Sequence, residues 1–234
     1  MTPGFDVMVL APHPDDAEIA CAGVLLQLVA AGRRTCVVDL TRGEMGSRGD
    51  TETRAQECDA ATGMLGIEHR RNLGLPDAML RDDDDTLAQV VGVIRELQPR
   101  ILLAPHWKDV HPDHRAGAEI ARRAFFHSGL RNYNKDVPAF RPALLAHYPG
   151  NDPIVPSFCV DISAEVEAKR RVIECYASQV QDADASHMVR KVPYLRRVEA
   201  RDRYFGGFIG CAAAEPFFVE GPLSVRSFTS LLET

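Results

Sequence analysis

Short apolar runs alternate with helical segments through the first half of the chain, and this alternation constrains the fold more than any other feature. Three runs have the length and composition of buried strands, at 6–11, 35–41 and 100–105, and a further short strand is predicted around 69–74. The segments between them have helical spacing, at 16–32, 51–66 and 86–98. Short strands separated by helices are typical of a parallel sheet with both faces covered. The sequence therefore predicts an α/β fold: a Rossmann-like, doubly wound and mostly parallel sheet with helices on both faces.

The second half of the chain is less regular. Strands are predicted at 143–149 and 157–163, a late edge strand at 215–221, and helices at 164–179 and 194–210. The pattern contains no internal repeat, low-complexity tract or clear linker. A chain of 234 residues can bury a substantial core in one unit. We therefore predict a single domain over residues 1–234.

The charge and cysteine content argue against several classes of partner and compartment. The formal net charge is −6, whereas a protein that binds nucleic acid usually presents a basic face. No apolar run reaches membrane-spanning length, and the pattern of a signal peptide is not visible. The six cysteines form no C-x-x-C pair and favour a reducing compartment. We therefore expect a soluble cytoplasmic protein that acts on a small molecule and binds neither nucleic acid nor a membrane.

Two polar clusters directly follow the first and the fourth predicted strands, and both contain the string HPD. The first cluster holds His13, Asp15, Asp16 and Glu18, and the second is "HWKDVHPDH" at 106–114. In an open α/β sheet, ligands bind in the crevice beyond the carboxyl ends of the strands. If the two strands lie side by side, the two clusters therefore meet in that crevice.

A metal site is one explanation for two such clusters. A catalytic zinc ion takes three protein ligands from His, Asp or Glu and keeps a fourth position for water. The remaining carboxylates and imidazoles can then act as general base, general acid or orienting groups. The alternative is that Asp16 is only a helix N-cap and His114 only a residue in a first helical turn. The presence of two HPD strings, each at a strand end, favours the metal site.

The stretches "PHPDDAE" and "HPDH" resemble the LmbE-like, PIG-L-like de-N-acetylases. These are zinc-dependent enzymes with a Rossmann-like fold that remove acetyl groups from N-acetylglucosamine (GlcNAc) derivatives. The stretches "DLTRGEMGSRGD", "TRAQE", "NLGLPD", "YASQ" and "VEARDR" are similar to the branch that deacetylates N-acetylglucosaminyl malate in bacillithiol biosynthesis. The resemblance implies a hydrolase of linear amide C–N bonds that uses Zn²⁺, with Fe²⁺ or another divalent metal as the alternative in the cell. It also implies a homo-oligomer, either a trimer or a hexamer.

Motif by motif, the resemblance implies roles for individual residues. It makes Asp15 the general base that takes a proton from the attacking water. It makes His111 the group that protonates the departing amine or stabilises charge, with Asp113 orienting its imidazole. Tyr194 is similar in placement to a tyrosine that hydrogen-bonds the tetrahedral oxyanion. The implied metal ligands are His13, Asp16 and His114.

Basic residues are the candidates for substrate binding. Arg54 resembles the family's substrate-binding arginine. Arg48 lies in the Gly-rich loop 42–50, which either lines the sugar pocket or forms a mobile lid. Val110 departs from the branch, because a basic residue is expected directly before HPDH. If that position helps to hold malate, the anion must bind elsewhere, for example at Arg54, Arg48 or Lys108.

Other functions stay open at this point. The same chemistry could act on another amide, such as a mycothiol-type or thiol conjugate, or on GlcNAc compounds in general. A zinc-binding protein without catalysis would have no use for the spare acids Asp15 and Asp113. A nucleotide-binding oxidoreductase would carry G-x-G-x-x-G after the first strand, where this chain has "PHPDDAE".

Overall fold

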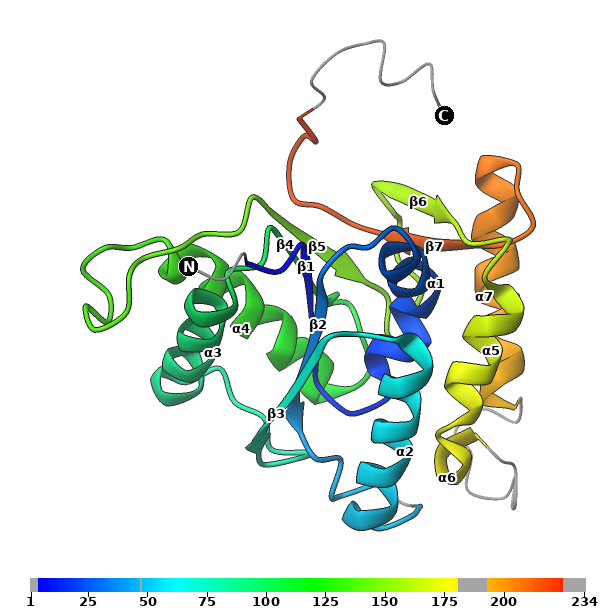
Figure 1. The fold of residues 1–234 in the computed structure, drawn as a ribbon, viewed down its shortest axis with the longest axis horizontal. Helices are drawn as coiled ribbons and strands as arrows, with labels where there is room; N and C mark the ends of the chain where they lie inside the picture. Colours follow the sequence, from blue (N-terminus) through cyan, green and yellow to red (C-terminus); the bar gives the residue numbers. More distant parts are fainter. Residues whose placement is uncertain (1–3, 47, 181–192, 225–234) are drawn as a thin grey trace.

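The computed structural model describes residues 4–46, 48–180 and 193–224. Its centre is a five-stranded parallel sheet with the strand order β3-β2-β1-β4-β5 (Figure 1). The strands are β1 (Val7–Ala11), β2 (Thr35–Thr41), β3 (His69–Leu75), β4 (Ile101–Pro105) and β5 (Leu144–Tyr148). The helices that follow the first four strands are α1 (Asp16–Ala30), α2 (Thr51–Leu65), α3 (Asp84–Leu97) and α4 (Pro112–Ser128). The predicted α/β fold with a mostly parallel sheet is confirmed.

Apolar layers lie on both faces of the sheet, because consecutive side chains of a strand point to opposite faces. In β1, Met8 and Leu10 belong to a buried cluster that includes residues of α3 and α4. Val7 and Val9 belong to a second cluster, which includes residues of α1 and α2. Figure 1 shows α3 and α4 on one side of the sheet and α1 and α2 on the other. Each such side chain contributes about 1.5–3 kcal/mol when fully buried, so β1 is held from both sides.

Acidic N-caps fix the starts of α2 and α3. Asp50 accepts a hydrogen bond from the backbone N of Thr53 at 2.7 Å, and Asp83 accepts one from Thr86 at 2.9 Å. Such a cap satisfies one of the N–H groups that the first helical turn leaves without an intrahelical partner. The helix α2 ends at Gly66, whose φ of 68° suits a glycine.

The second half differs from the prediction in two ways. The strands β6 (Phe158–Asp161) and β7 (Ala214–Phe217) pair antiparallel as a separate two-stranded sheet. A single bridge from His147 to Phe218 links this small sheet to β5. The predicted helix at 164–179 is two helices, α5 (Val166–Glu174) and α6 (Ala177–Val180). The helix α7 (Tyr194–Ile209) agrees with the prediction, and α5 and α7 lie outside α1 (Figure 1).

The break between α5 and α6 has a physical reason in the side chains around it. Tyr176 is buried and donates a hydrogen bond from its hydroxyl to Glu18 at 3.1 Å. The backbone N of Ser178 donates to the Glu57 carboxylate at 2.6 Å. Periodicity along the sequence predicts a continuous helix, because these partners come from distant parts of the chain.

The chain reverses its winding direction between β1 and β4. These strands are neighbours in the sheet, with β2 and β3 on one side and β5 on the other. Such a switch point opens a crevice at the carboxyl ends of the two strands. The two HPD strings follow β1 and β4, so the fold brings both polar clusters to this crevice.

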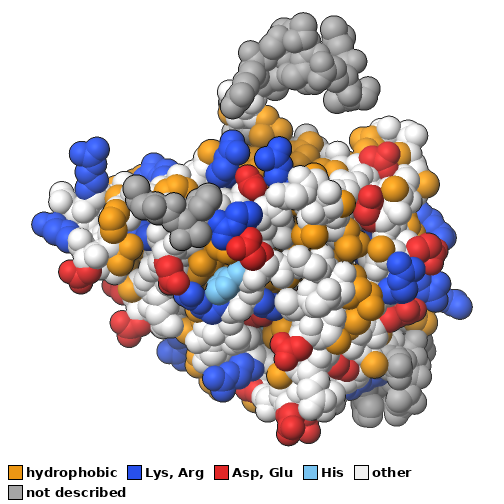
Figure 2. Space-filling view, in the orientation of Figure 1, with side chains coloured by type: hydrophobic (Ala, Val, Ile, Leu, Met, Phe, Trp, Pro, Cys, Tyr) orange, Lys and Arg blue, Asp and Glu red, His pale blue; other side chains and the backbone are white. Residues whose placement is uncertain are grey.

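Two surface observations bear on the expected partners. Among the residues that the structure describes, no helix is long and apolar enough to cross a membrane. On the described part of the face in Figure 2, basic and acidic side chains are intermixed.

Candidate metal and catalytic site

Three predicted metal ligands converge at the switch point. His13 lies in the turn after β1, Asp16 is the first residue of α1, and His114 lies in the first turn of α4. His13 Nδ1 is 3.2 Å from one Asp16 carboxylate oxygen, and His114 Nε2 is 3.2 Å from the other. One ligand atom from each of the three residues lies within 4.8 Å of the others. Two imidazoles and one carboxylate at this spacing form a donor set that suits a catalytic divalent metal.

Carboxylates stand behind both imidazoles, on the nitrogen that faces away from Asp16. His13 Nε2 is 3.1 Å from Asp77 and 3.2 Å from Asp113. His114 Nδ1 is 3.1 Å from Asp109. A metal-binding histidine usually donates its other N–H to such a group, which fixes the tautomer and the ring orientation. The neutral rings would therefore present lone pairs at His13 Nδ1 and His114 Nε2, both toward Asp16.

The surrounding acids make this cluster favourable for positive charge. Burial alone would lower the pKa of His13, but hydrogen bonds to Asp113, Asp16 and Asp77 raise it to about 12. Burial opposes the charge of His114 in the same way, and the nearby Asp16 and Asp109 raise its pKa to about 10. The residues therefore favour a cation between them, as protons on the imidazoles or as a divalent metal.

A second group with metal-ligand spacing is less suited to hold an ion. His13, His111 and Asp113 also lie within 4.8 Å of one another. The ring nitrogen Nδ1 of His111 already accepts a hydrogen bond from the Asp113 backbone N at 3.2 Å. The Asp113 carboxylate accepts from the backbone N–H groups of Ala78 at 2.7 Å and Leu80 at 3.3 Å. These acceptor positions are therefore engaged. In the first group, one Asp16 oxygen also accepts from the His13 backbone N at 3.0 Å, and both Asp16 oxygens face the imidazole nitrogens.

The Asp113 carboxylate differs from its predicted place. It contacts the His13 ring and two backbone amides, and the hydrogen bond to His111 is made by the Asp113 backbone N instead. The reason is local geometry: His111 is the N-cap of α4, so its ring bends back onto the helix start. By its contacts, Asp113 therefore orients His13 rather than the His111 imidazole.

Asp15 points away from the ligand set although it is adjacent to Asp16. Its φ of 126° lies in a region that non-glycine residues rarely adopt, and it caps α1 without a side-chain hydrogen bond. Its carboxylate is 3.2 Å from Arg54 Nη1, which also donates to the Pro14 carbonyl at 2.7 Å. Burial raises the pKa of Asp15 to about 7, against the opposing charge of Arg54 and with the help of Asp16. The strained turn thus separates the Asp16 carboxylate, a predicted metal ligand, from the Asp15 carboxylate, which remains available for proton transfer.

A polar hollow of about 280 Å³ opens beside the ligand set. The Gly-rich loop forms one wall, and it is tied down where Asp77 accepts from Met45 N at 2.8 Å and donates its own N–H to Glu44 at 2.9 Å. The hollow is lined by His13, Asp15, Gly43, Met45, Gly46, Arg54, Asp77, Ala78, His111 and Gln179. Arg54 therefore lies where the resemblance expects it. Arg48 is not among these described lining residues.

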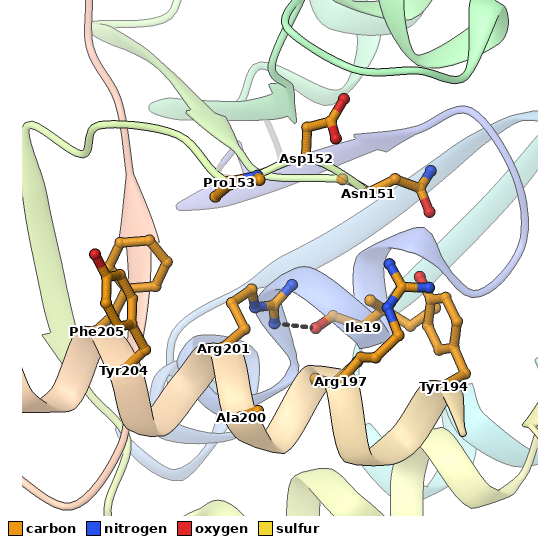
Figure 3. Close-up of a pocket in the computed structure, with 12 residues that line it drawn as sticks. Ile19, Asn151, Asp152, Pro153, Tyr194, Arg197, Ala200, Arg201, Tyr204 and Phe205 are labelled. Carbon is orange, nitrogen blue, oxygen red and sulfur yellow. Dashed lines mark hydrogen bonds between the residues drawn. The ribbon is translucent and has the colours of Figure 1, made fainter. Parts of the chain in front are cut away.

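Tyr194 reaches a neighbouring cleft at the start of α7. Figure 3 shows this cleft between α7 and the segment that carries Asn151, with Tyr194 and Ile19 on its wall. Burial raises the pKa of Tyr194, and the charges of Asp15 and Asp16 raise it further, so the phenol keeps its proton. Tyr194 lines this cleft together with Ile19 of α1. Its role toward an oxyanion stays a prediction.

Two acids of the site carry no role in the sequence-based assignment, Asp77 and Asp109. Asp109 accepts from the backbone N of His111 at 2.7 Å and of Asn151 at 2.6 Å, which aims its carboxylate at His114. Gly150 packs directly on Asp109 and His114, and a Cβ there would collide with both. For Asp109, the signal available in the sequence is its place in the polar cluster after β4. For Asp77, it is the stretch "NLGLPD", which spans the end of β3.

Two further residues of interest lie outside the ligand set. Glu18 is fully buried and pairs with Arg70, so it belongs to the core rather than to the hollow. Val110 is 62% exposed and is not among the described residues that line the hollow.

Comparisons with known proteins agree with this geometry. The sequence pattern of the PIG-L family, described as GlcNAc-PI de-N-acetylase, matches residues 8–125. A diacetylchitobiose deacetylase of Thermococcus kodakarensis is 29% identical over 229 residues, which cover 92% of this chain and 83% of that protein. A probable N-acetyl-alpha-D-glucosaminyl L-malate deacetylase 2 of Bacillus subtilis is 34% identical over 137 residues, or 51% of this chain and 60% of that protein. The crystal structure of a conserved protein from Thermus thermophilus has a TM-score of 0.87 at 38% identity and covers 96% of this chain and 98% of that one. The chain belongs to the PIG-L family of de-N-acetylases.

Proposed function

We propose that this protein is a metal-dependent N-deacetylase that hydrolyses the acetamido group of a small GlcNAc conjugate. The observation that carries the proposal is the set of His13, Asp16 and His114, with lone pairs facing one another and the separate carboxylate of Asp15 beside them. A bound divalent metal, Zn²⁺ by the donor set or Fe²⁺ in the cell, would acidify a water molecule and polarise the amide carbonyl.

Asp15 is the group proposed to move the proton. Its pKa of about 7 lies near the operating pH of most enzymes, where a general base works best. Arg54 holds its carboxylate at 3.2 Å and keeps it apart from Asp16. In this scheme an Asp15 oxygen takes a proton from the attacking water and returns it to the nitrogen of the departing amine. Water and the amide are thereby converted to acetic acid and a free amine, and the acid then ionises to acetate.

His111 is proposed to donate a hydrogen bond rather than a proton. Its Nδ1 accepts the Asp113 backbone N–H at 3.2 Å, so the neutral ring carries its own proton on Nε2. Burial and the neighbouring His114 and His13 lower the pKa of His111, which favours this neutral form. A neutral imidazole N–H in the hollow can stabilise the oxyanion of the tetrahedral intermediate. Tyr194 is proposed as a second donor to the same oxyanion.

We propose N-acetylglucosaminyl malate, of bacillithiol biosynthesis, as the substrate. The malate deacetylase of Bacillus subtilis supports this choice, and Arg54 supplies a cation in the hollow. Arg48 and Lys108 are the further candidates for the malate carboxylates. A related disaccharide is the second candidate, since the Thermococcus kodakarensis relative is a diacetylchitobiose deacetylase. Within this proposal the enzyme works in the cytoplasm as a homo-oligomer, a trimer or a hexamer.

The test of the proposed reaction uses chelated protein to which zinc is added back. Wild-type protein should release acetate from N-acetylglucosaminyl malate, and Asp15→Asn should bind zinc normally yet lose at least about 100-fold in kcat/KM. Asp136→Asn, on an exposed loop, is the matched control and should behave like the wild type. Near-wild-type turnover by Asp15→Asn would rule out the general-base role. Faster hydrolysis of diacetylchitobiose than of the malate conjugate would move the substrate assignment to the second candidate.

A further inference from the structure

Two stretches that are far apart in the sequence meet beside the hollow. "TRAQE" at 53–57 starts α2 and supplies Arg54 to the hollow, and its last residue is Glu57. "YASQ" at 176–179 leads into α6, and its last residue, Gln179, lines the same hollow as Asp15 and His111. The proposed chemistry gives Glu57 and Gln179 no task, and yet their side chains are joined through a single residue, Ser178.

The hydrogen bonds from Glu57 to Gln179 have a fixed direction. The Glu57 carboxylate can only accept, so Ser178 donates to it from its backbone N at 2.6 Å and from its hydroxyl at 2.7 Å. The Ser178 oxygen, having given its proton to Glu57, accepts from Gln179 Nε2 at 2.9 Å. The second proton on Nε2 goes to the Arg48 carbonyl, also at 2.9 Å.

This chain of bonds decides which way the Gln179 amide faces. Both acceptors bind Nε2, and a backbone carbonyl cannot donate, so the nitrogen must lie on that side. Among the described residues, Oε1 of Gln179 has no hydrogen-bond partner. The amide oxygen is therefore a positioned acceptor in a polar hollow, and no other residue that the structure describes occupies it.

The Gly-rich loop is shaped to permit this arrangement. Gly49 has a φ of 69°, and a Cβ at this position would lie 3.0 Å from the Ser178 hydroxyl. A side chain at Gly49 would therefore push Ser178 and the Arg48 carbonyl apart. Three elements thus cooperate to hold one amide: the loop, α2 and α6, which carries Ser178.

We infer that Gln179 is a specificity-determining residue, whose Oε1 accepts a hydrogen bond from a hydroxyl of the sugar ring, and that Glu57 positions it through Ser178. The inference rests on the proposed function, because it takes the ring to be that of the GlcNAc conjugate. A sugar hydroxyl needs an acceptor as well as donors, and Arg54 supplies only donors to the hollow. The carboxylates that line the hollow, Asp15 and Asp77, already face Arg54 and His13. The ligand class is therefore a hydroxylated ring whose acetamido group faces His13 and Asp15.

The test compares Gln179→Ala with wild type on zinc-reconstituted protein. The substrates are N-acetylglucosaminyl malate and its 3-deoxy, 4-deoxy and 6-deoxy analogues. On the parent compound Gln179→Ala should lose roughly tenfold in kcat/KM, mainly through a higher KM, because the bond is present in ground and transition states alike. On the one analogue that lacks the bonded hydroxyl, wild type and variant should be equal within about twofold.

A matched control separates this role from a structural one. Gln27 in α1 also donates two hydrogen bonds from Nε2, to the Asp161 carbonyl and to Glu165, and it does not line the hollow. Gln27→Ala should leave the KM for all four compounds unchanged. Glu57→Gln should raise the KM in the same direction as Gln179→Ala but by less, since it weakens the hold on Ser178.

The outcomes distinguish this inference from the proposed function. If wild type hydrolyses the parent compound and Gln179→Ala does so equally well, or loses the same factor on all four compounds, the inference is wrong and the proposed function stands. If wild type hydrolyses none of them, calorimetry with glucosaminyl malate decides. Binding that weakens about tenfold in Gln179→Ala would support a sugar site, whereas no binding by wild type would overturn both proposals.

Discussion

Two buried charged clusters begin in the first turn of α1, and they are built on opposite principles. Glu18 pairs with Arg70, which also holds Asp39 at 2.7 Å and so supplies the cation for both carboxylates. Asp16, two residues earlier, meets the imidazoles of His13 and His114, which have Asp77, Asp109 and Asp113 behind them. The first cluster carries its own permanent cation, Arg70, and Glu18 also accepts from the Tyr176 hydroxyl at 3.1 Å. The second is an excess of acids around titratable rings, which is the arrangement that a metal ion completes.

The comparison explains why adjacent acids of one sequence motif have different roles. A buried carboxylate is costly unless a partner compensates its charge. Arg70 is a permanent cation, so Glu18 contributes to stability without a ligand. Imidazoles change charge with conditions, so the rings of His13 and His114 can release their protons when a metal binds beside Asp16. The kind of partner, and not burial itself, therefore separates the structural acid from the functional one.

The largest effect is expected from removing a ligand of the second cluster. His114→Ala should lower kcat/KM by more than about 100-fold, because even the partners behind a ligand account for 10–100-fold. Acetate release from N-acetylglucosaminyl malate with zinc added measures it. The folded state should persist, as judged by circular dichroism. Activity within tenfold of wild type would contradict the view that the second cluster, unlike the first, is the metal site.

A substitution in the first cluster should lower the stability of the fold and leave the affinity for a metal unchanged. Arg70→Met leaves the buried Glu18 and Asp39 without their cation and should lower the free energy of unfolding by about 3–5 kcal/mol. Urea denaturation measures this loss, with the exposed Arg33→Met as the control. The fraction that stays folded should still bind zinc. If folded Arg70→Met protein had no affinity for zinc, the two clusters would not be independent of each other.

A smaller effect is expected from a carboxylate behind a ligand. Asp109→Asn keeps the shape but weakens the hold on His114 Nδ1, so zinc affinity should fall about 10–100-fold. Competition with a chromogenic chelator measures the affinity. Asp82→Asn, whose carboxylate pairs with Arg123 away from the site, is the matched control. An unchanged zinc affinity in Asp109→Asn would show that the Asp109 carboxylate does not contribute to metal binding by His114.

A further effect is a dependence of stability on pH in the metal-free protein. The folded pKa values of His13 and His114, about 12 and about 10, exceed the ordinary imidazole value of 6.5. The folded state therefore holds more protons than the unfolded chain above about pH 6.5, and its stability should fall as the pH rises toward 10. Melting temperatures measured from pH 7 to pH 9 should decline in chelated protein and stay nearly level with zinc bound. A flat profile without zinc would contradict the raised pKa values.

Local sequence signals predict much of the fold and the centre of the site. The apolar runs of β1 and β4 and the HPD strings behind them suffice to bring His13, Asp16 and His114 together. Signals of this kind are local, because strand and helix periodicity depends on neighbouring residues. Local patterns alone do not distinguish Asp15 from Asp16, to which the family resemblance assigns different roles. The structure supplies the physical reason, since the φ of 126° at Asp15 sends the two carboxylates apart.

The remainder depends on contacts between distant segments. Asp77 reaches His13 from the end of β3, and Ser178 reaches Glu57 across 121 positions. The Asp113 carboxylate likewise accepts a hydrogen bond from the backbone N–H of Ala78. No spacing pattern in the sequence predicts this contact. The break between α5 and α6 has the same origin, because a tertiary hydrogen bond replaces a helical one. Such contacts are identified only from the structure, because the packing of distant segments determines which residues meet.

Zinc content is the most direct test of the difference between the two clusters. Wild type, His114→Ala and Arg70→Met are stripped with a chelator, reloaded with zinc, freed of excess metal and assayed for zinc per folded chain. The account predicts about one zinc ion per chain in wild type and in folded Arg70→Met, and far less than one in His114→Ala. Stoichiometric zinc in His114→Ala, or its loss from folded Arg70→Met, would contradict it.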